Sequence, residues 1–219
     1  MISEEMLNRL RAIDTPTLCN AVEALKLRDR TEGFMGYDIR CILPELAPMV
    51  GFAVTATARS TVPGPPGDPS GAQKLWRAVN DSPKPAVVIL KDVGPDRSRS
   101  CHYGDMMATL SKRLGAVGLV TDGGVRDLKG VKALGFQYFA AGVTPAHGNC
   151  EIVEVGLEVR IAGATVRPGD LIHADENGVA VFPPSIAKEL LLAAQDVIDR
   201  ESARIAVYNS PGFKVSDLK

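Results

Sequence analysis

Strand-like and helix-like hydrophobic patterns alternate through the middle of the chain. Short apolar runs typical of buried strands are separated by segments whose apolar residues recur every three to four positions, the spacing of a helix with one buried face. The pattern predicts strands over 51–58, 86–90, 116–121 and 136–140, and helices over 71–80, 105–114 and 126–134. The turn between the third strand and the last of these helices is predicted at Asp122-Gly123-Gly124. This alternation indicates an α/β fold.

The two ends of the chain follow other patterns. Helices are predicted over 3–12 and 16–27, and the second has a start signal in Asp14-Thr15-Pro16, a capping residue followed by proline in the first turn. A proline- and glycine-rich loop is expected over 62–71. Short strands broken by glycine-containing turns are predicted over 151–160, 163–167, 170–174 and 178–182, and a long helix over 184–208.

Length and charge narrow the class of protein. The 219 residues show no internal repeat and no linker, so we expect a single domain over 1–219. Lys and Arg number 25 and Asp and Glu 26, which argues against binding nucleic acid through a large basic surface. No apolar run approaches the roughly 18 residues of a membrane span. The N-terminus lacks the apolar segment of a signal peptide, so we expect a cytoplasmic protein without a membrane partner.

The cysteine and histidine positions in the sequence do not indicate a catalytic or metal-binding site. The four cysteines, Cys19, Cys41, Cys101 and Cys150, are far apart and are interpreted as reduced thiols, and they show no Cys/His arrangement that would suggest a nucleophile. The three histidines are not at the spacing of metal ligands.

Two segments on either side of the predicted strand 116–121 could bind an anion. Residues 103–108 and 122–127 each place glycine before a predicted helix, where free N–H groups and the helix dipole favour negative charge. Asp127 could simply complement that dipole. Arg126 could not, because a cation is unfavourable at a helix start, and a bound carboxylate explains it better. These residues indicate an anion or metal site.

The spacing of these segments resembles a known signature. Asp105, followed after twenty residues by Arg126-Asp127, resembles the D-x20-R-D motif of the 4-hydroxy-4-methyl-2-oxoglutarate (4-carboxy-4-hydroxy-2-oxoadipate) aldolases. These metal-dependent enzymes share a fold with the RraA-type regulators of ribonuclease E, and the group was formerly named dimethylmenaquinone methyltransferase-like. The likeness continues in residues 18–21, 51–56 and 168–183, although Cys19 and Asn20 replace the family's Ser and Asp.

The resemblance implies a fold and a set of roles. The fold would be a layered α/β/β/α sandwich of the RraA-like, phosphohistidine swivelling-domain-like type. Asp127 would ligate Mg²⁺ or Mn²⁺, and Arg126 would bind the substrate and stabilise the enolate that forms from it. The backbone of Gly104, Asp105, Met106 and Met107 would bind the pyruvate carboxylate. Asp105 would also orient or deprotonate a water that acts as the base.

The family also supplies an acidic residue from the C-terminal helix of a neighbouring subunit. Helix 184–208 has an apolar stripe that includes Val197 and Ile205, and Glu201 lies on that stripe midway between them. We therefore favour Glu201 over Asp196 and Asp199 as the residue that acts at the metal in trans, through water. The helix would then pack at a subunit interface in a homotrimer or a dimer of trimers.

The reading implied by the resemblance is a class II pyruvate aldolase. It would release pyruvate from a 4-hydroxy-2-oxo acid and would decarboxylate oxaloacetate as a side activity. Two alternatives stay open. One is a non-catalytic RraA-like regulator that binds a ribonuclease and needs neither Asp105, Asp127 nor metal. The other is a lyase of the same fold that acts on a different 2-keto acid.

Overall fold

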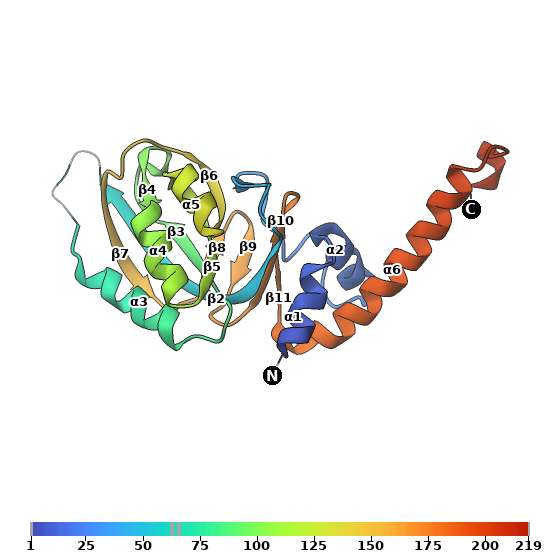
Figure 1. Ribbon diagram of the computed structural model, residues 1–219, viewed down its shortest axis with the longest axis horizontal. Helices are drawn as coiled ribbons and strands as arrows, with labels where there is room; N and C mark the ends of the chain where they lie inside the picture. Colours follow the sequence, from blue (N-terminus) through green and yellow to red (C-terminus); the bar gives the residue numbers. More distant parts are fainter. Residues whose placement is uncertain (1, 62–63, 65–66, 219) are drawn as a thin grey trace.

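A computed structural model of the protein describes residues 2–61, 64 and 67–218. Within these residues, nine strands form one curled sheet in the order β1-β6-β5-β3-β2-β10-β11, with β4 beside β5 and β7 beside β2 (Figure 1). The strands of this sheet are β1 (Arg40–Cys41), β2 (Met49–Thr61), β3 (Ala86–Asp92), β4 (Cys101–Tyr103), β5 (Ala116–Val125), β6 (Gln137–Val143), β7 (Asn149–Val155), β10 (Leu171–Asp175) and β11 (Gly178–Phe182). A separate hairpin is formed by β8 (Val159–Ile161) and β9 (Ala164–Val166).

Helices cover the sheet in two groups. The helices are α1 (Glu4–Arg11), α2 (Thr15–Ala24), α3 (Ser70–Asp81), α4 (Asp105–Arg113), α5 (Leu128–Leu134) and α6 (Ala187–Tyr208). Figure 1 shows α3, α4 and α5 on one side of the molecule and α1, α2 and α6 on the other. The start of α2 is as predicted, since Asp14 accepts a hydrogen bond of 2.7 Å from the Thr17 N–H and proline stands in the first turn.

The parallel strands at the centre are buried on both faces. Strands β2, β3, β5 and β6 pair in parallel, as the strand–helix alternation predicts. Along β3, Val88 and Leu90 point into the apolar cluster beneath α3, α4 and α5. Val87 and Ile89 point into a second cluster, which the β8–β9 hairpin and β10 complete. A third cluster joins β10 and β11 to α1, α2 and α6. The predicted α/β/β/α layering is confirmed, with both β layers belonging to one curled sheet.

Several predicted boundaries are wrong. The predicted turn Asp122-Gly123-Gly124 lies inside β5, which continues to Val125, and α5 begins at Leu128 rather than at residue 126. The predicted strand 151–160 is divided between β7 and β8, which belong to different sheets. In the predicted loop 62–71, residues 62, 63, 65 and 66 lie outside the described residues, and α3 already begins at Ser70.

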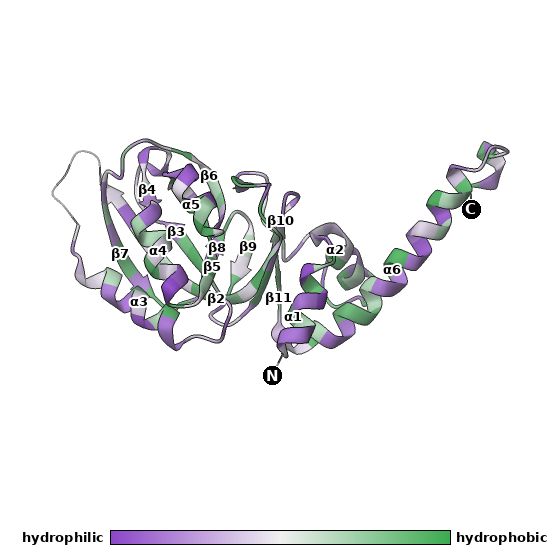
Figure 2. Cartoon of the chain, in the orientation of Figure 1, coloured by the Kyte–Doolittle hydropathy of each residue, from purple (hydrophilic) through white to green (hydrophobic). Residues whose placement is uncertain are grey.

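Helix α6 differs between its two halves. Leu190, Ala194 and Val197 are buried against the rest of the chain, whereas Ile205 and Tyr208 are 56% and 45% exposed. The outer half extends away from the other elements, and apolar and polar positions alternate along it (Figure 2). The apolar stripe predicted for this helix is therefore only half covered within one chain. Among the described residues, none of the helices combines the length and the apolar composition that crossing a membrane requires.

Candidate active site

The two predicted binding segments meet at the carboxyl ends of β4 and β5. These strands are parallel neighbours, with Tyr103 opposite Val125. The backbone N–H of Arg126 also donates a hydrogen bond of 3.0 Å to the Tyr103 carbonyl. Because the carboxyl ends of adjacent parallel strands open on the same edge of a sheet, the residues that follow each strand lie side by side. The sheet therefore brings Gly104 and Asp105 next to Arg126 and Asp127.

Asp127 links the two segments through its side chain. It occupies the left-handed backbone region, with φ of 60°, and is the residue immediately before α5. Its Oδ2 accepts a hydrogen bond of 3.2 Å from the backbone N–H of Asp105, the first residue of α4. Only Oδ2 is engaged among the described residues, so the other carboxylate oxygen is left to bind a ligand.

Arg126 is held beside this carboxylate without a hydrogen bond to it. Its Nε lies 3.3 Å from Oδ2 of Asp127 in an ion pair. The direction is poor, however, and the buried Nε–H has no hydrogen-bond partner in the described part of the chain. A buried donor without a partner is costly and marks a place where a ligand acceptor belongs. The Arg126 side chain is one-third exposed, so the guanidinium can be reached from outside.

Glycine at position 104 leaves room for the side chains of Asp127 and Arg126. A Cβ at Gly104 would overlap the Asp127 carboxylate and lie 2.9 Å from Nε of Arg126. Gly104 also caps the N-terminus of α4 without a side-chain hydrogen bond. The N–H groups of Met106 and Met107, in the first turn, have no acceptor within the helix. With Met106 84% exposed, this helix end is open to an anion.

Two buried tyrosines fix the position of this turn. The Tyr103 hydroxyl hydrogen-bonds Ser111 Oγ at 3.0 Å, and the Tyr138 hydroxyl donates to the Gly104 carbonyl at 3.4 Å. Burial raises the pKa of both hydroxyls, so each stays a neutral donor. No sequence pattern marked these supports, because the contact between Tyr138 and Gly104 depends on the pairing of β4, β5 and β6.

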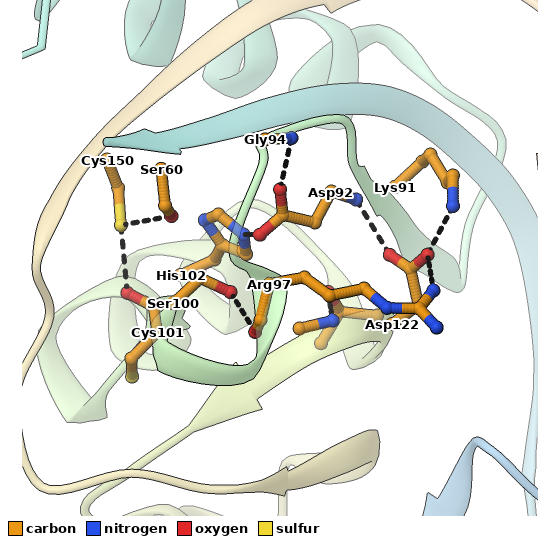
Figure 3. Close-up of polar contacts among 12 residues, drawn as sticks. Ser60, Lys91, Asp92, Gly94, Arg97, Ser100, Cys101, His102, Asp122 and Cys150 are labelled. Atoms are coloured by element: carbon orange, nitrogen blue, oxygen red, sulfur yellow. Dashed lines mark hydrogen bonds and ion pairs between the residues drawn. The ribbon is translucent and has the colours of Figure 1, made fainter. Parts of the chain in front are cut away.

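Asp122 of β5 forms a buried ionic centre with residues at the end of β3. Its side chain is 2% exposed; Oδ1 accepts a hydrogen bond of 2.7 Å from the Asp92 N–H. Oδ2 contacts the Lys91 ammonium and Nη1 of Arg97, the latter at 3.2 Å (Figure 3). The carboxylate thereby binds the loop after β3 to β5.

A metal at this edge would have few protein ligands. In the ranges that the structure describes, no group of three or more His, Cys, Asp or Glu side chains is arranged to hold a metal ion. Asp105 and Asp127 are the carboxylates at the edge, and this donor set fits a hard cation that keeps most of its waters. Glu201 is on α6, and its Oε1 accepts a hydrogen bond of 3.2 Å from Nδ2 of Asn20 in the same chain.

One cluster contradicts the sequence analysis directly. Cys150 does have a histidine neighbour, because β7 pairs with β2 and brings Cys150 beside His102 of β4 (Figure 3). Forty-eight positions separate the two residues, so no local motif could reveal the pair. Asp92 lies 2.8 Å from the same histidine.

Comparison with known proteins decides the family. A family model described as RraA-like, Aldolase/RraA, matches residues 15–181. The chain belongs to the RraA-like family. The membership expected from the sequence motifs is thus confirmed, and the match covers most of this RraA-like protein. The described fold and the site on β4 and β5 lie largely within the matched range.

Individual relatives agree with this placement. A protein of Halalkalibacterium halodurans, provisionally named 4-hydroxy-4-methyl-2-oxoglutarate aldolase, is 35% identical over 121 residues, which are 55% of this chain and 57% of that protein. The matched part therefore spans little more than half the length of this curated relative. An uncharacterized protein of Pseudomonas syringae has a similar structure, with a TM-score of 0.76 and 25% identity over 96% of this chain and 91% of its own.

A second solved structure that is similar to this chain is named for ribonuclease inhibition. RraAS2 of Streptomyces coelicolor, described as an unusual member of the RNase ES inhibitor RraA family, has a TM-score of 0.71 and 25% identity. The alignment covers 92% of this chain and 96% of that one. The family thus contains proteins named for two different activities.

Proposed function

We propose that this RraA-like protein is a divalent-metal-dependent class II pyruvate aldolase. Its substrate would be a 4-hydroxy-2-oxo acid of the 4-hydroxy-4-methyl-2-oxoglutarate type. The observation that carries the proposal is that the open N-terminus of α4 lies beside Arg126 and Asp127. There the buried Nε–H of Arg126 has no partner within the described part of the chain. The name of the Halalkalibacterium relative supports the same activity.

The site can hold a 2-oxo acid in one orientation. The N–H groups of Met106 and Met107 bind the carboxylate, which the positive end of α4 also attracts. The Arg126 guanidinium faces the 2-oxo oxygen. Asp127, with Asp105 beside it, would hold Mg²⁺ or Mn²⁺, which when bound supplies a Lewis acid for the 2-oxo group.

Carbon–carbon cleavage then needs a base and a stabiliser of negative charge. Asp105 takes the proton of the 4-hydroxyl, directly or through water, and the bond between C3 and C4 breaks. The electron pair moves to the 2-oxo oxygen as an enolate, whose charge Arg126 stabilises. Protonation at C3 gives pyruvate, and C4 leaves as the carbonyl of a second keto acid. Loss of carbon dioxide from oxaloacetate forms the same enolate, so one site serves both reactions.

The proposal is tested by pyruvate release from 4-hydroxy-4-methyl-2-oxoglutarate and from oxaloacetate. We expect release from both with Mg²⁺, loss of release in EDTA, and loss in Asp127→Ala. Asp81→Ala, an exposed carboxylate at the end of α3, is the matched control and should stay active. Release from oxaloacetate alone would point to a lyase for another 2-keto acid. Metal-independent release, or full activity of Asp127→Ala, would refute the metal site.

Glu201 enters this proposal from a second copy of the chain. In one chain α6 and the β4–β5 edge lie on opposite sides of the molecule (Figure 1). The uncovered half of α6 carries Ile205 and Tyr208, apolar side chains that a neighbouring subunit would bury. We expect a homotrimer or a dimer of trimers, in which Glu201 acts through water at the neighbour's Asp127.

This arrangement predicts complementation between inactive variants. Asp127→Ala and Glu201→Gln should each lose pyruvate release when pure. After subunit exchange in an equal mixture, about one quarter of the sites in a cyclic oligomer would combine an intact Asp127 with an intact Glu201, and activity should return to that extent. If both residues act within one chain, mixing restores nothing. Analytical ultracentrifugation of each variant checks that assembly itself is unchanged.

A regulatory function is the second candidate, supported by the likeness to RraAS2. A regulator would bind a ribonuclease of the E type without using Asp127. Pull-down of that ribonuclease by wild-type protein and by Asp127→Ala alike, without pyruvate release from either substrate, would favour it over the aldolase.

A further inference from the structure

The thiol of Cys150 lies in a polar cluster that the proposed aldolase reaction does not use. Its Sγ is 3.2 Å from Oγ of Ser60, 3.3 Å from the Cys101 carbonyl and 2.7 Å from the His147 carbonyl. The fourth neighbour is the imidazole of His102 (Figure 3). Cys150 is only partly buried, so the sulfur can be reached from outside.

His102 is held with one nitrogen directed at this thiol. The residue is 7% exposed, and its Nε2 lies 2.8 Å from Oδ2 of Asp92, whose other oxygen accepts the Gly94 N–H at 2.6 Å. A carboxylate at Nε2 fixes the proton there and leaves a lone pair on Nδ1. Nδ1 is buried and has no hydrogen-bond partner among the described residues. Figure 3 shows it on the side of the ring that faces Cys150.

The charges of the cluster favour transfer of the thiol proton to this nitrogen. Burial alone would lower the pKa of His102, but the hydrogen bond to Asp92 and the interaction with Cys150 raise it to about 9. Burial likewise opposes ionisation of Cys150, yet its interactions with His102 and Ser60 outweigh that effect and lower the pKa of the thiol. A thiolate beside an imidazolium is the form in which cysteine is nucleophilic.

The thiol opens into a cavity of about 420 Å³ between β7 and the first turns of α3 and α4. Apolar side chains from each wall line it: Pro69, Ala72, Met107 and Ile152. The other titratable groups in the lining are Cys101, His147, Asp68 and Glu151. Arg59 pairs with Glu151, so Asp68 is the carboxylate here that disfavours an anionic ligand. Cys150, His102 and Asp92 are not arranged as a metal site in the part of the chain that is described.

We propose that Cys150, His102 and Asp92 form a second catalytic centre, in which Cys150 is acylated by a small uncharged ester or thioester. The thiol proton first passes to Nδ1 of His102, which gives a thiolate beside an imidazolium, and Sγ of the thiolate then attacks the acyl carbon. The bond from that carbon to the leaving oxygen or sulfur breaks, and His102 passes the proton to the leaving group. The products are an S-acyl cysteine and an alcohol or thiol, and Asp92 keeps the imidazole oriented throughout.

The probe is p-nitrophenyl acetate, offered to the full-length protein at pH 7. We expect a burst of p-nitrophenolate of one equivalent per chain and an acetyl group on Cys150 by peptide mass mapping. Cys150→Ala should lose both signals, and His102→Gln should slow the burst about 10²-fold or more. Cys19→Ala is the matched control, because Cys19 is a partly buried thiol whose pKa burial raises, and it should change neither signal.

Wild-type protein alone provides a further test, in case His102→Gln does not fold. The acylation rate at Cys150 should level off at a lower pH than that of an ordinary thiol, which has a pKa of about 8.5 and would continue to react faster up to that value. Acetyl groups spread over Cys19, Cys41 and lysines at the rate of Cys150 would overturn the proposal. Alkylation of Cys150 by iodoacetamide without acylation by the ester would overturn it too.

Discussion

Replacing Arg126 by alanine is expected to lower kcat for pyruvate release about 10²–10³-fold, the usual cost of removing a donor that stabilises a developing oxyanion. The structural reason is the buried Nε–H, which has no partner among the residues that the structure describes and which a bound enolate oxygen would satisfy. Lysine should not rescue the activity, because a single ammonium cannot reproduce the planar guanidinium beside Asp127. Steady-state kinetics of Arg126→Ala and Arg126→Lys measure both effects.

Arg113→Ala is the matched control for these kinetics. Arg113 is an exposed arginine at the far end of α4, so its removal changes the net charge equally and leaves the site intact. Both kcat and KM should stay at wild-type values. If Arg126→Ala raised KM and left kcat unchanged, Arg126 would bind substrate and transition state equally, and its role as enolate stabiliser would be wrong.

Replacing Asp122 by alanine should produce the largest loss of stability. The change removes the acceptor for the buried Asp92 N–H and leaves the Lys91 ammonium beside an apolar gap. Breaking a buried ion pair costs about 3–5 kcal/mol, and we expect about 3 kcal/mol because Lys91 and Arg97 still reach water. For a domain of this size that lowers Tm by about 6–12 °C in thermal unfolding followed by circular dichroism.

Arg97→Ala separates the buried from the exposed part of the same cluster. The Arg97 side chain is 53% exposed, so its pair with Asp122 should contribute at most about 1 kcal/mol. Equal losses of Tm in Arg97→Ala and Asp122→Ala would show that the exposed arginine, and not the buried carboxylate, holds the loop after β3 in place.

The layered α/β fold was predictable because the sequences of its central strands are continuous apolar runs. Residues 86–90, Ala-Val-Val-Ile-Leu, are buried on both faces, and the sequence pattern already required that. That Asp105 and Asp127 belong to one site was implied by the family resemblance and not by the hydrophobic pattern. The two residues meet because β4 pairs in parallel with β5. The hydrophobic pattern did not reveal β4, because this strand has only three residues.

The segment 122–124 was predicted as a turn from its local sequence, but it lies inside a strand. Asp-Gly-Gly is typical of a turn. Here Gly124 pairs with Cys101 on one side and with Gly142 on the other, so the strand continues. A Cβ at Gly124 would lie 2.5 Å from the Ser100 carbonyl, which means that the glycine serves close strand packing. Such a role depends on neighbours distant in sequence, as does the approach of Cys150 to His102.

The left-handed backbone of Asp127 has a consequence for how this family can diverge. A residue with a side chain at φ of 60° is less stable there than glycine would be. Glycine would relieve this strain but would also remove the acceptor for the Asp105 N–H, so for the fold alone the two effects oppose each other. A lineage that stopped using the site could therefore exchange Asp127 for glycine at little cost in stability, whereas a lineage that uses the carboxylate could not.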